Sequence, residues 1–174
     1  MNVGRNASGV HYTPANVMAT ILIRPKGGAR PLTPAVVSKD VADDYNEACL
    51  VLPDSPKASA ALSRRCLQHI LREKAGVKHG DLASEIQQVL DANKVPSHIA
   101  ESIDAVRNIG NFAAHPGKSK LTGEVVPVET GEAEWNLDVI EMLFDFYYVQ
   151  PELSKQKRAA LNAKLKDAGK PEMK

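Results

Sequence analysis

Apolar residues recur with a helical period through most of this chain, from residue 34 almost to its end. In the first such segment four of them share one helical face, three or four residues apart: Val37, Val41, Tyr45 and Ala48. Thr33 and Pro34 suit the N-cap and the first position of a helix. We therefore predict a helix over residues 34–50, ended by Pro53.

The stretch SPKASAALSRRCLQHILREKAG predicts a second helix with marked ends. Ser55 can cap it, Pro56 suits its first position, and Gly76 follows its end. Its apolar stripe consists of Ala58, Leu62, Cys66, Leu67, Ile70 and Leu71. A third, shorter helix is predicted over residues 81–92, with Asp81 as its cap. Its buried positions are expected to be Leu82, Ile86, Val89 and Leu90.

Two longer helices are predicted in the second half of the chain. One begins near Pro96 and Ser97 and includes the stretch VRNIGNFAAHPG, Val106 to Gly117. The other lies in EAEWNLDVIEMLFDFYYV, whose apolar positions at helical spacing are Trp135, Val139, Met142, Phe146 and Val149. Between the two helices we expect a loop over residues 116–130, with a short strand in EVVPV.

The two ends of the chain differ from this helical middle. Residues 1–33 are rich in Gly, Pro, Asn and Thr, and residues 17–24 are strand-like.

The helical periodicity of the chain as a whole indicates an all-α fold, with a bundle of about five to six helices over residues 34–153. Residues 1–33 are expected to form an extended arm with one short strand. Residues 154–174 are expected to form a basic C-terminal helix or tail, helical to about residue 168.

Length and composition indicate one ordinary globular domain. The 174 residues suffice for a single core, and 43% apolar with 25% charged residues is typical of soluble proteins. Aromatic residues are only 5%, so aliphatic side chains must fill the core. No segment resembles a signal peptide or a membrane span, and we therefore expect a cytoplasmic protein without a membrane partner.

The residues that bind cofactors in other proteins are scattered here. Cys49 and Cys66 lie far apart without CxxC spacing, so we expect two reduced, buried thiols. The five histidines form no metal-binding pair. The stretch RPKGGARP has two glycines but lacks the Gly-Lys-Ser/Thr of a phosphate-binding loop. We therefore predict neither a metal site nor another cofactor.

Charge is distributed unevenly along the chain. The formal net charge is +1, but the residues from Lys155 onward carry +5 and the rest of the chain carries −4. A basic tail on an acidic body could bind nucleic acid. Because no aromatic residues are interleaved with the basic ones, the tail is more typical of a solvated helix.

The helix that begins near Pro96 carries two opposite stripes. A helix turns about 100° per residue, so one face holds the apolar and small residues Ile99, Ile103, Val106, Gly110 and Ala113. Nearly opposite lies a polar stripe with the same spacing, consisting of Asp104, Asn108, Asn111 and His115. Arg107 lies on the shoulder between the two stripes. Short polar side chains are unusual on a plain solvent face, and they indicate fixed hydrogen bonds.

Two uses of these hydrogen bonds remain open. In the structural use, Asn108 and Asn111 fix an adjacent loop or a second subunit, and His115 contacts free carbonyls at the helix end. In the chemical use, His115 is a general acid or base, and Arg107 holds a phosphate. The residues alone favour the structural use.

Three blocks of the sequence are similar to a known family. They are SPKASAALSRRCLQHILREKAG, SIDAVRNIGNFAAHP and GEAEWNLDVIEMLFDFYYVQP, and they resemble the bacterial domain-of-unknown-function family numbered 4145 over roughly residues 32–155. That family is usually grouped with the HEPN-like helical bundles. The resemblance implies an all-α HEPN-like bundle that tends to dimerise. It also implies association with restriction, toxin–antitoxin and other defence systems.

The same resemblance implies a candidate catalytic set. Active HEPN members cleave RNA without a metal, using an Arg, the polar residue after it and a His four to six residues beyond the Arg. The matching residues here are Arg107, Asn108 and His115, but seven residues separate Arg107 from His115. That spacing turns the two side chains about 80° apart on an ideal helix. Arg64 or Arg65 could supply the positive charge instead, although Arg64 could equally be a structural ion-pair partner.

Three functions follow as hypotheses. The first is a non-catalytic module that forms a homodimer or docks onto a larger protein of a defence or nucleic-acid-processing system. The second is a metal-independent endoribonuclease in which His115 transfers the proton, Arg107 stabilises the phosphorane and Asn108 orients the scissile group. The third binds RNA or another nucleic acid through the basic tail. The acidic body of the chain favours the first over the second.

Overall fold

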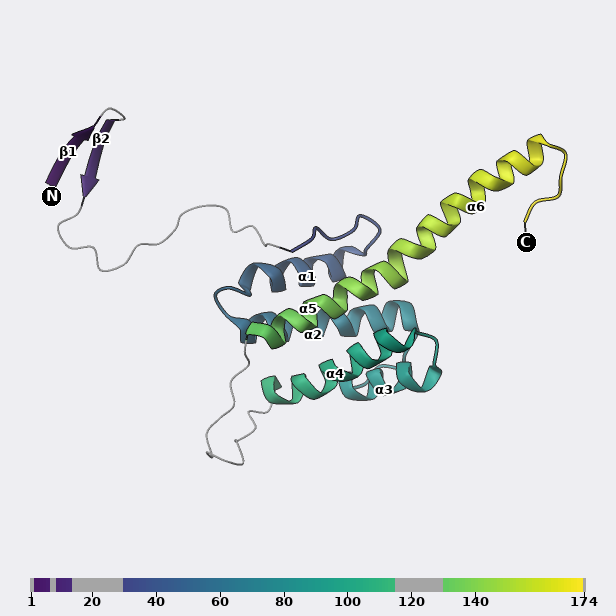
Figure 1. Ribbon diagram of the computed structural model, residues 1–174. Helices are drawn as coiled ribbons and strands as arrows, with labels where there is room; N and C mark the ends of the chain where they lie inside the picture. Colours follow the sequence, from purple (N-terminus) through teal and green to yellow (C-terminus); the bar gives the residue numbers. More distant parts are fainter. Residues whose placement is uncertain (1, 7–8, 14–29, 115–129, 174) are drawn as a thin grey trace.

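The computed structural model describes residues 2–6, 9–13, 30–114 and 130–173, and side chains for residues 30–107 and 130–173. Within these ranges the protein is an all-α helical bundle, as predicted (Figure 1). The helical elements, in chain order, are α1 (Lys39–Val51), α2 (Pro56–Ile70), the π-helix η1 (Leu71–Ala75), α3 (Leu82–Ala92), α4 (Ser97–Ala114), α5 (Thr130–Phe144), the π-helix η2 (Asp145–Val149) and α6 (Gln150–Asp167).

Helix α2 is the central element of the bundle. It packs against α1, α5 and α4, while α3 packs against α4 and η1. The core between these helices is mostly aliphatic, and its largest fully buried side chains include Tyr45, Leu67, Ile70, Leu71, Ile86, Ile103, Leu137, Ile140 and Leu143. Helix α6 extends beyond the other helices (Figure 1). The low aromatic content therefore leads to the aliphatic core that the composition predicts.

A small β element lies near the N-terminus. Strands β1 (Asn2–Asn6) and β2 (Gly9–Thr13) pair antiparallel, with Asn2 opposite Thr13. The sequence pattern predicts one strand in this arm, over residues 17–24, which lie outside the described residues. The short strand expected in EVVPV also lies outside them.

The predicted ends of α2, α3 and α4 are confirmed. The Ser55 hydroxyl accepts a hydrogen bond from the Ala58 amide, and the Asp81 carboxylate accepts one from the Ser84 amide. Gly76 ends η1 in the left-handed conformation, with a φ of 67°, which glycine adopts without a steric penalty. Helix α4 begins at Ser97, where the sequence places it.

The predicted start of the first helix is wrong. Residues 34–37 form a turn in which the Val37 amide donates to the Pro34 carbonyl, and α1 begins only after Ser38. Thr33 does not cap a helix, because its hydroxyl donates instead to the Asn46 side chain. The apolar face predicted for this segment is nevertheless buried, since Val37 packs into the same core as α1.

The structure also corrects the last two predicted helices. The chain remains helical from Thr130 to Asp167, without the separate start expected at Ser154. Pro151 lacks a backbone donor, and its ring crowds the carbonyl four residues earlier. The π-helix η2 widens the backbone at this point, and Gln150 donates to the Asp145 carbonyl five residues earlier. The helix can therefore continue through a proline.

The predicted apolar face of α5 is only partly correct. Val139 is fully buried, but Trp135 is exposed, and Met142, Phe146 and Val149 are only partly buried. The buried face instead contains Ala133, Asn136, Leu137, Val139, Ile140, Leu143 and Phe144. Because α5 packs against three neighbours, α1, α2 and α4, its buried face is wider than one stripe and is rotated away from Trp135.

Two further expectations concern the whole chain. Cys49 and Cys66 are both buried and form no disulfide, as predicted. In the part of the chain that the structure describes, none of the helices combines the length and the apolar character that crossing a membrane requires.

Candidate functional site

The polar stripe of α4 lies only partly within the described residues. Its backbone is helical to Ala114, and the opposite core stripe is buried at Ile99, Ile103 and Val106. The side chains of Asn108 and Asn111 lie outside the described residues, as does the whole of His115. The catalytic set with His115 therefore stays a prediction, and the stripe can be followed only at Asp104 and Arg107.

Arg107 already has partners inside the protein. Its guanidinium donates to the Gln87 side-chain carbonyl on α3 at 2.8 Å, and it forms an ion pair with Asp104 one turn earlier on α4. These contacts direct Arg107 toward α3 and fix α4 against that helix. A phosphate bound by Arg107 would have to compete with both contacts.

Arg64 lies on α2 beside the same part of α4. Its guanidinium is partly buried and donates to the Val106 carbonyl at 3.2 Å. Burial lowers the pKa of Arg64, and among the described residues no carboxylate forms an ion pair with it. The Arg64 guanidinium is therefore a positive charge that no described carboxylate neutralises. It contacts α4 at Val106, one residue before Arg107.

Arg65, the next residue on α2, is used differently. It donates two hydrogen bonds to one oxygen of Asp44, a carboxylate on α1 that is almost completely buried. The other oxygen of Asp44 lies 3.3 Å from Nδ1 of His69. The Asp44–Arg65 contact thus ties α2 to α1, and Arg65 is committed to this structural contact.

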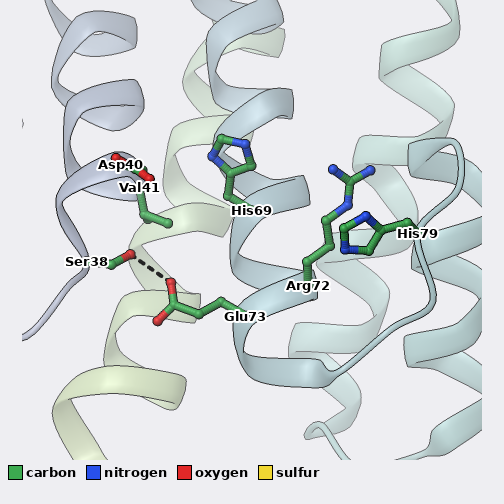
Figure 2. Close-up of a pocket in the computed structure, with 7 residues that line it drawn as sticks. All are labelled: Ser38, Asp40, Val41, His69, Arg72, Glu73 and His79. Carbon is green, nitrogen blue, oxygen red and sulfur yellow. Dashed lines mark hydrogen bonds between the residues drawn. The ribbon is translucent and has the colours of Figure 1, made fainter.

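A polar cavity of about 510 Å³ opens at the end of α2, next to His69. Figure 2 shows the side chains around it, which come from the start of α1, from α2, from η1 and from the loop before α3. The lining residues are Ser38, Asp40, Val41, His69, Arg72, Glu73 and His79. His69 and His79 are its two proton-transfer candidates.

Arg72, at the base of this cavity, is held by a buried acid. Its guanidinium donates to Oε1 of Glu85 at 2.8 Å and to the Gly80 carbonyl at 3.2 Å. Glu85 lies on α3, is completely buried, and also accepts a hydrogen bond from the Gly80 amide. The Arg72–Glu85 pair therefore holds the loop that carries His79 against η1 and α3.

Glu73 joins the opposite side of the cavity to the bundle. It accepts hydrogen bonds from the Ser38 hydroxyl at 2.7 Å and the Tyr148 hydroxyl at 3.0 Å, and it pairs with Lys74. Partial burial acts to raise the pKa of Glu73, but these three donors outweigh it, and the pKa is lower than the usual value. Glu73 is thus an ionised structural link between α1, η1 and η2.

These contacts limit what the cavity can do. Arg72 and Glu73 both have partners within the protein, and within the described ranges no three His, Cys, Asp or Glu side chains gather as metal ligands would. His69 and His79 also line the cavity, but the Ser38 hydroxyl, which could serve as a nucleophile there, donates instead to Glu73, so these residues do not form a complete catalytic set. We therefore describe the cavity as a structural junction.

Helix α6 has the most unusual surface of the described chain. None of its side chains is buried, although Leu153 and Leu161 are large apolar residues with 40% and 46% of their surface exposed. Its basic residues are all exposed: Lys155, Lys157, Arg158, Lys164 and Lys166. An isolated helix of this length is only marginally stable in water without a packed face.

An acidic ridge, Glu134, Asp138, Glu141 and Asp145, runs along the outer side of α5 and the start of η2. Arg30 forms ion pairs with Asp138 and Glu141 and donates to the Glu134 carbonyl. One guanidinium leaves most of the ridge's negative charge uncompensated. Trp135 lies beside the ridge and exposes 40% of its surface.

The sequence contains a signal for this ridge. The four acidic residues recur at the spacing of one helical face, and this pattern is readable without a structure. No comparable signal exists for the Asp44–Arg65 or Arg72–Glu85 pairs. Their members are far apart in sequence, and charged residues are rarely expected in a core.

Comparisons with known proteins give a family and no further relative. The family model described as a domain of unknown function (DUF4145) matches residues 46–167, which is most of the chain. None of the curated proteins matches the sequence. None of the solved structures matches it either.

Proposed function

The chain belongs to the DUF4145 family, and we propose that it is a protein-interaction module that dimerises or docks onto a larger protein. The biological setting that we propose for it is a bacterial defence or nucleic-acid-processing system, as the resemblance to HEPN-like bundles implies. In this proposal the chain is a non-catalytic binding module, and any catalytic reaction is carried out by its partner.

The uncovered helix α6 carries this proposal. The bundle from α1 to η2 encloses its own core, whereas α6 buries no side chain and exposes Leu153 and Leu161. Exposed apolar residues on a regular helix are typical of a binding face, where a partner covers them and the flanking charges select that partner. The polar cavity is consistent with this view, because its Arg72 and Glu73 are each bound to partners within the protein, Glu85 and Ser38.

The test is site-specific photo-crosslinking in the organism that encodes the protein. A photoreactive residue at Leu161 on α6 is expected to form covalent protein adducts, since a partner covers that position. The matched control is Leu50, which is exposed to a similar extent, 41%, but lies on α1. The proposal fails if Leu161 gives no adduct, or if Leu50 gives the same adducts in the same yield.

The second candidate function is the metal-independent endoribonuclease, and the position of Arg64 favours it. Its guanidinium lies against the Val106 carbonyl of α4 without an ion-pair partner among the described residues. It could bind a phosphate in place of Arg107, which is bound to Gln87 and Asp104.

This candidate predicts RNA cleavage that persists in EDTA. His115→Ala and Arg64→Gln are each expected to reduce the cleavage rate by at least about a hundredfold, the usual effect of losing a proton-transfer or charge-stabilising group. Lys57→Gln, at an exposed position on the same helix as Arg64, should leave the rate unchanged. Folding of each variant is checked by circular dichroism. Activity that survives both active-site substitutions excludes this mechanism.

A further inference from the structure

The surfaces of α5 and α6 complement each other in charge. The acidic ridge of α5 is exposed at Glu134, Asp138 and Asp145, and α6 presents five exposed basic residues. Within one chain the two surfaces cannot meet, because α6 continues from α5 through η2 and points away from it (Figure 1). A second copy running in the opposite direction would place its α6 along the α5 of the first.

We infer that the partner of α6 is a second copy of this chain, bound antiparallel, so that the α6 of each copy covers the exposed side of α5 in the other. This inference rests on the proposed function, because it names the partner of the same surface. The arrangement is a two-fold symmetric dimer, in which the same contacts form twice.

One register satisfies the apolar and the charged residues together. It places Trp135 of one copy opposite Leu161 of the other, and both side chains are exposed in the single chain. Counting one residue forward on α5 for each residue back on α6, the same register brings Asp138 opposite Arg158. Like charges directly opposite one another do not occur among these pairs. The match therefore sets both direction and register.

The π-helix η2 helps to make this contact geometrically feasible. Two antiparallel helices touch along their length only if the residues that they use point to the same side. In an uninterrupted α-helix, Trp135 and Leu161 would point about 80° apart. Residues of a π-helix each turn through a smaller angle, so η2 rotates α6 back and brings Leu161 closer to the direction of Trp135.

Arg30 is the one described cation on the acidic ridge itself, and its position is compatible with the dimer. Arg30 forms ion pairs with Asp138 and Glu141 but not with the carboxylates of Glu134 and Asp145. The basic residues of the second copy would add to this neutralisation. The contact should therefore weaken as the salt concentration rises, because the charges at its edge are exposed.

Cysteine cross-linking tests the register. A chain with Trp135→Cys is mixed with a chain with Leu161→Cys and oxidised, and a disulfide between the two chains is expected. The matched control replaces Leu161→Cys by Leu153→Cys, which is similarly exposed on the same helix. In the inferred register that position lies about 12 Å farther along the helix axis, beyond the reach of a disulfide. The natural thiols Cys49 and Cys66 are buried and should not interfere.

Light scattering measures the dimer itself. The unmodified chain is expected at twice the monomer mass, and Lys157→Glu with Arg158→Glu should weaken self-association by about tenfold or more. The control with the same change in net charge is Lys57→Glu with Lys78→Glu, at exposed positions away from α6. It should still dimerise.

A monomeric wild-type chain overturns the inference, and so does a dimer in which Leu153→Cys cross-links to Trp135→Cys and Leu161→Cys does not. Equal loss of dimer in both charge variants overturns it as well. A failure of the dimer inference can be distinguished from a failure of the proposed function. A monomer that still forms adducts at Leu161 in cells has another partner, whereas a chain without adducts at that position has none there.

Discussion

Replacing Arg72 by methionine is expected to lower the free energy of unfolding by about 3–5 kcal/mol. Arg72 is the cation paired with Glu85, with contacts at 2.7 and 2.8 Å, and the Glu85 side chain has no exposed surface. Without Arg72 a buried carboxylate loses its counter-charge, while methionine keeps most of the side-chain volume. Urea denaturation followed by circular dichroism measures the change.

The double variant Arg72→Met with Glu85→Leu separates charge from packing. It removes both charges and is expected to be more stable than Arg72→Met alone, because no isolated charge is left in the core. Lys57→Met, at an exposed position on α2, serves as the control and should change the unfolding free energy of the bundle little. If Arg72→Met were as stable as Lys57→Met, the pair would not hold the loop before α3.

Replacing Tyr45 by alanine is expected to cost about 3–5 kcal/mol of unfolding free energy. Tyr45 is 1% exposed, and its ring packs edge-to-face on Phe144 with the centroids 5.1 Å apart. Its hydroxyl donates to Glu141 at 2.8 Å. The residue therefore joins α1 to α5, and its loss leaves a large cavity between them. Thermal and urea denaturation of the variant should both show the loss.

Tyr45→Phe divides this effect into packing and hydrogen bonding. Burial raises the pKa of Tyr45, and the hydrogen bond to Glu141 raises it further, so the hydroxyl stays protonated and remains a donor at neutral pH. Removing only the hydroxyl is expected to cost about 1 kcal/mol, since Glu141 keeps its ion pair with Arg30. A loss in Tyr45→Phe as large as in Tyr45→Ala would contradict the packing argument.

The helices were predictable because their signals are local. Ser55, Asp81 and Gly76 act at helix ends through hydrogen bonds or backbone angles that involve only a few neighbouring residues. Such capping residues can therefore be recognised from their positions in the sequence.

The apolar face of α1 was likewise predictable, because burial on one side of a helix leaves a periodic pattern. In α2 the prediction was only partly correct, since Ala58 and Leu62 are partly buried and the buried face includes Ser59, Ala60 and Ser63. The start of α1 was not predictable, because the Thr33 hydroxyl binds Asn46, a choice that depends on packing.

The candidate site was much less predictable. The family resemblance suggested Arg64, Arg65 and Arg107 as candidates, but the sequence could not distinguish their roles. Their contacts with Val106, Asp44 and Gln87 join different helices. Such contacts form only when α2 is packed between α1 and α4, and no periodicity in the sequence encodes them.

The sequence by itself determined that the chain is a bundle of helices, where most of them begin and end, and which charges lie on α6. Only the tertiary structure decided that α5 and α6 are joined through the π-helix η2 into one continuous helical segment and that Trp135 faces outward. It also decided which arginine is bound to which acid. The physical reason is range: capping and amphipathicity act over a few residues, whereas burial and ion pairing depend on which helices the fold brings together.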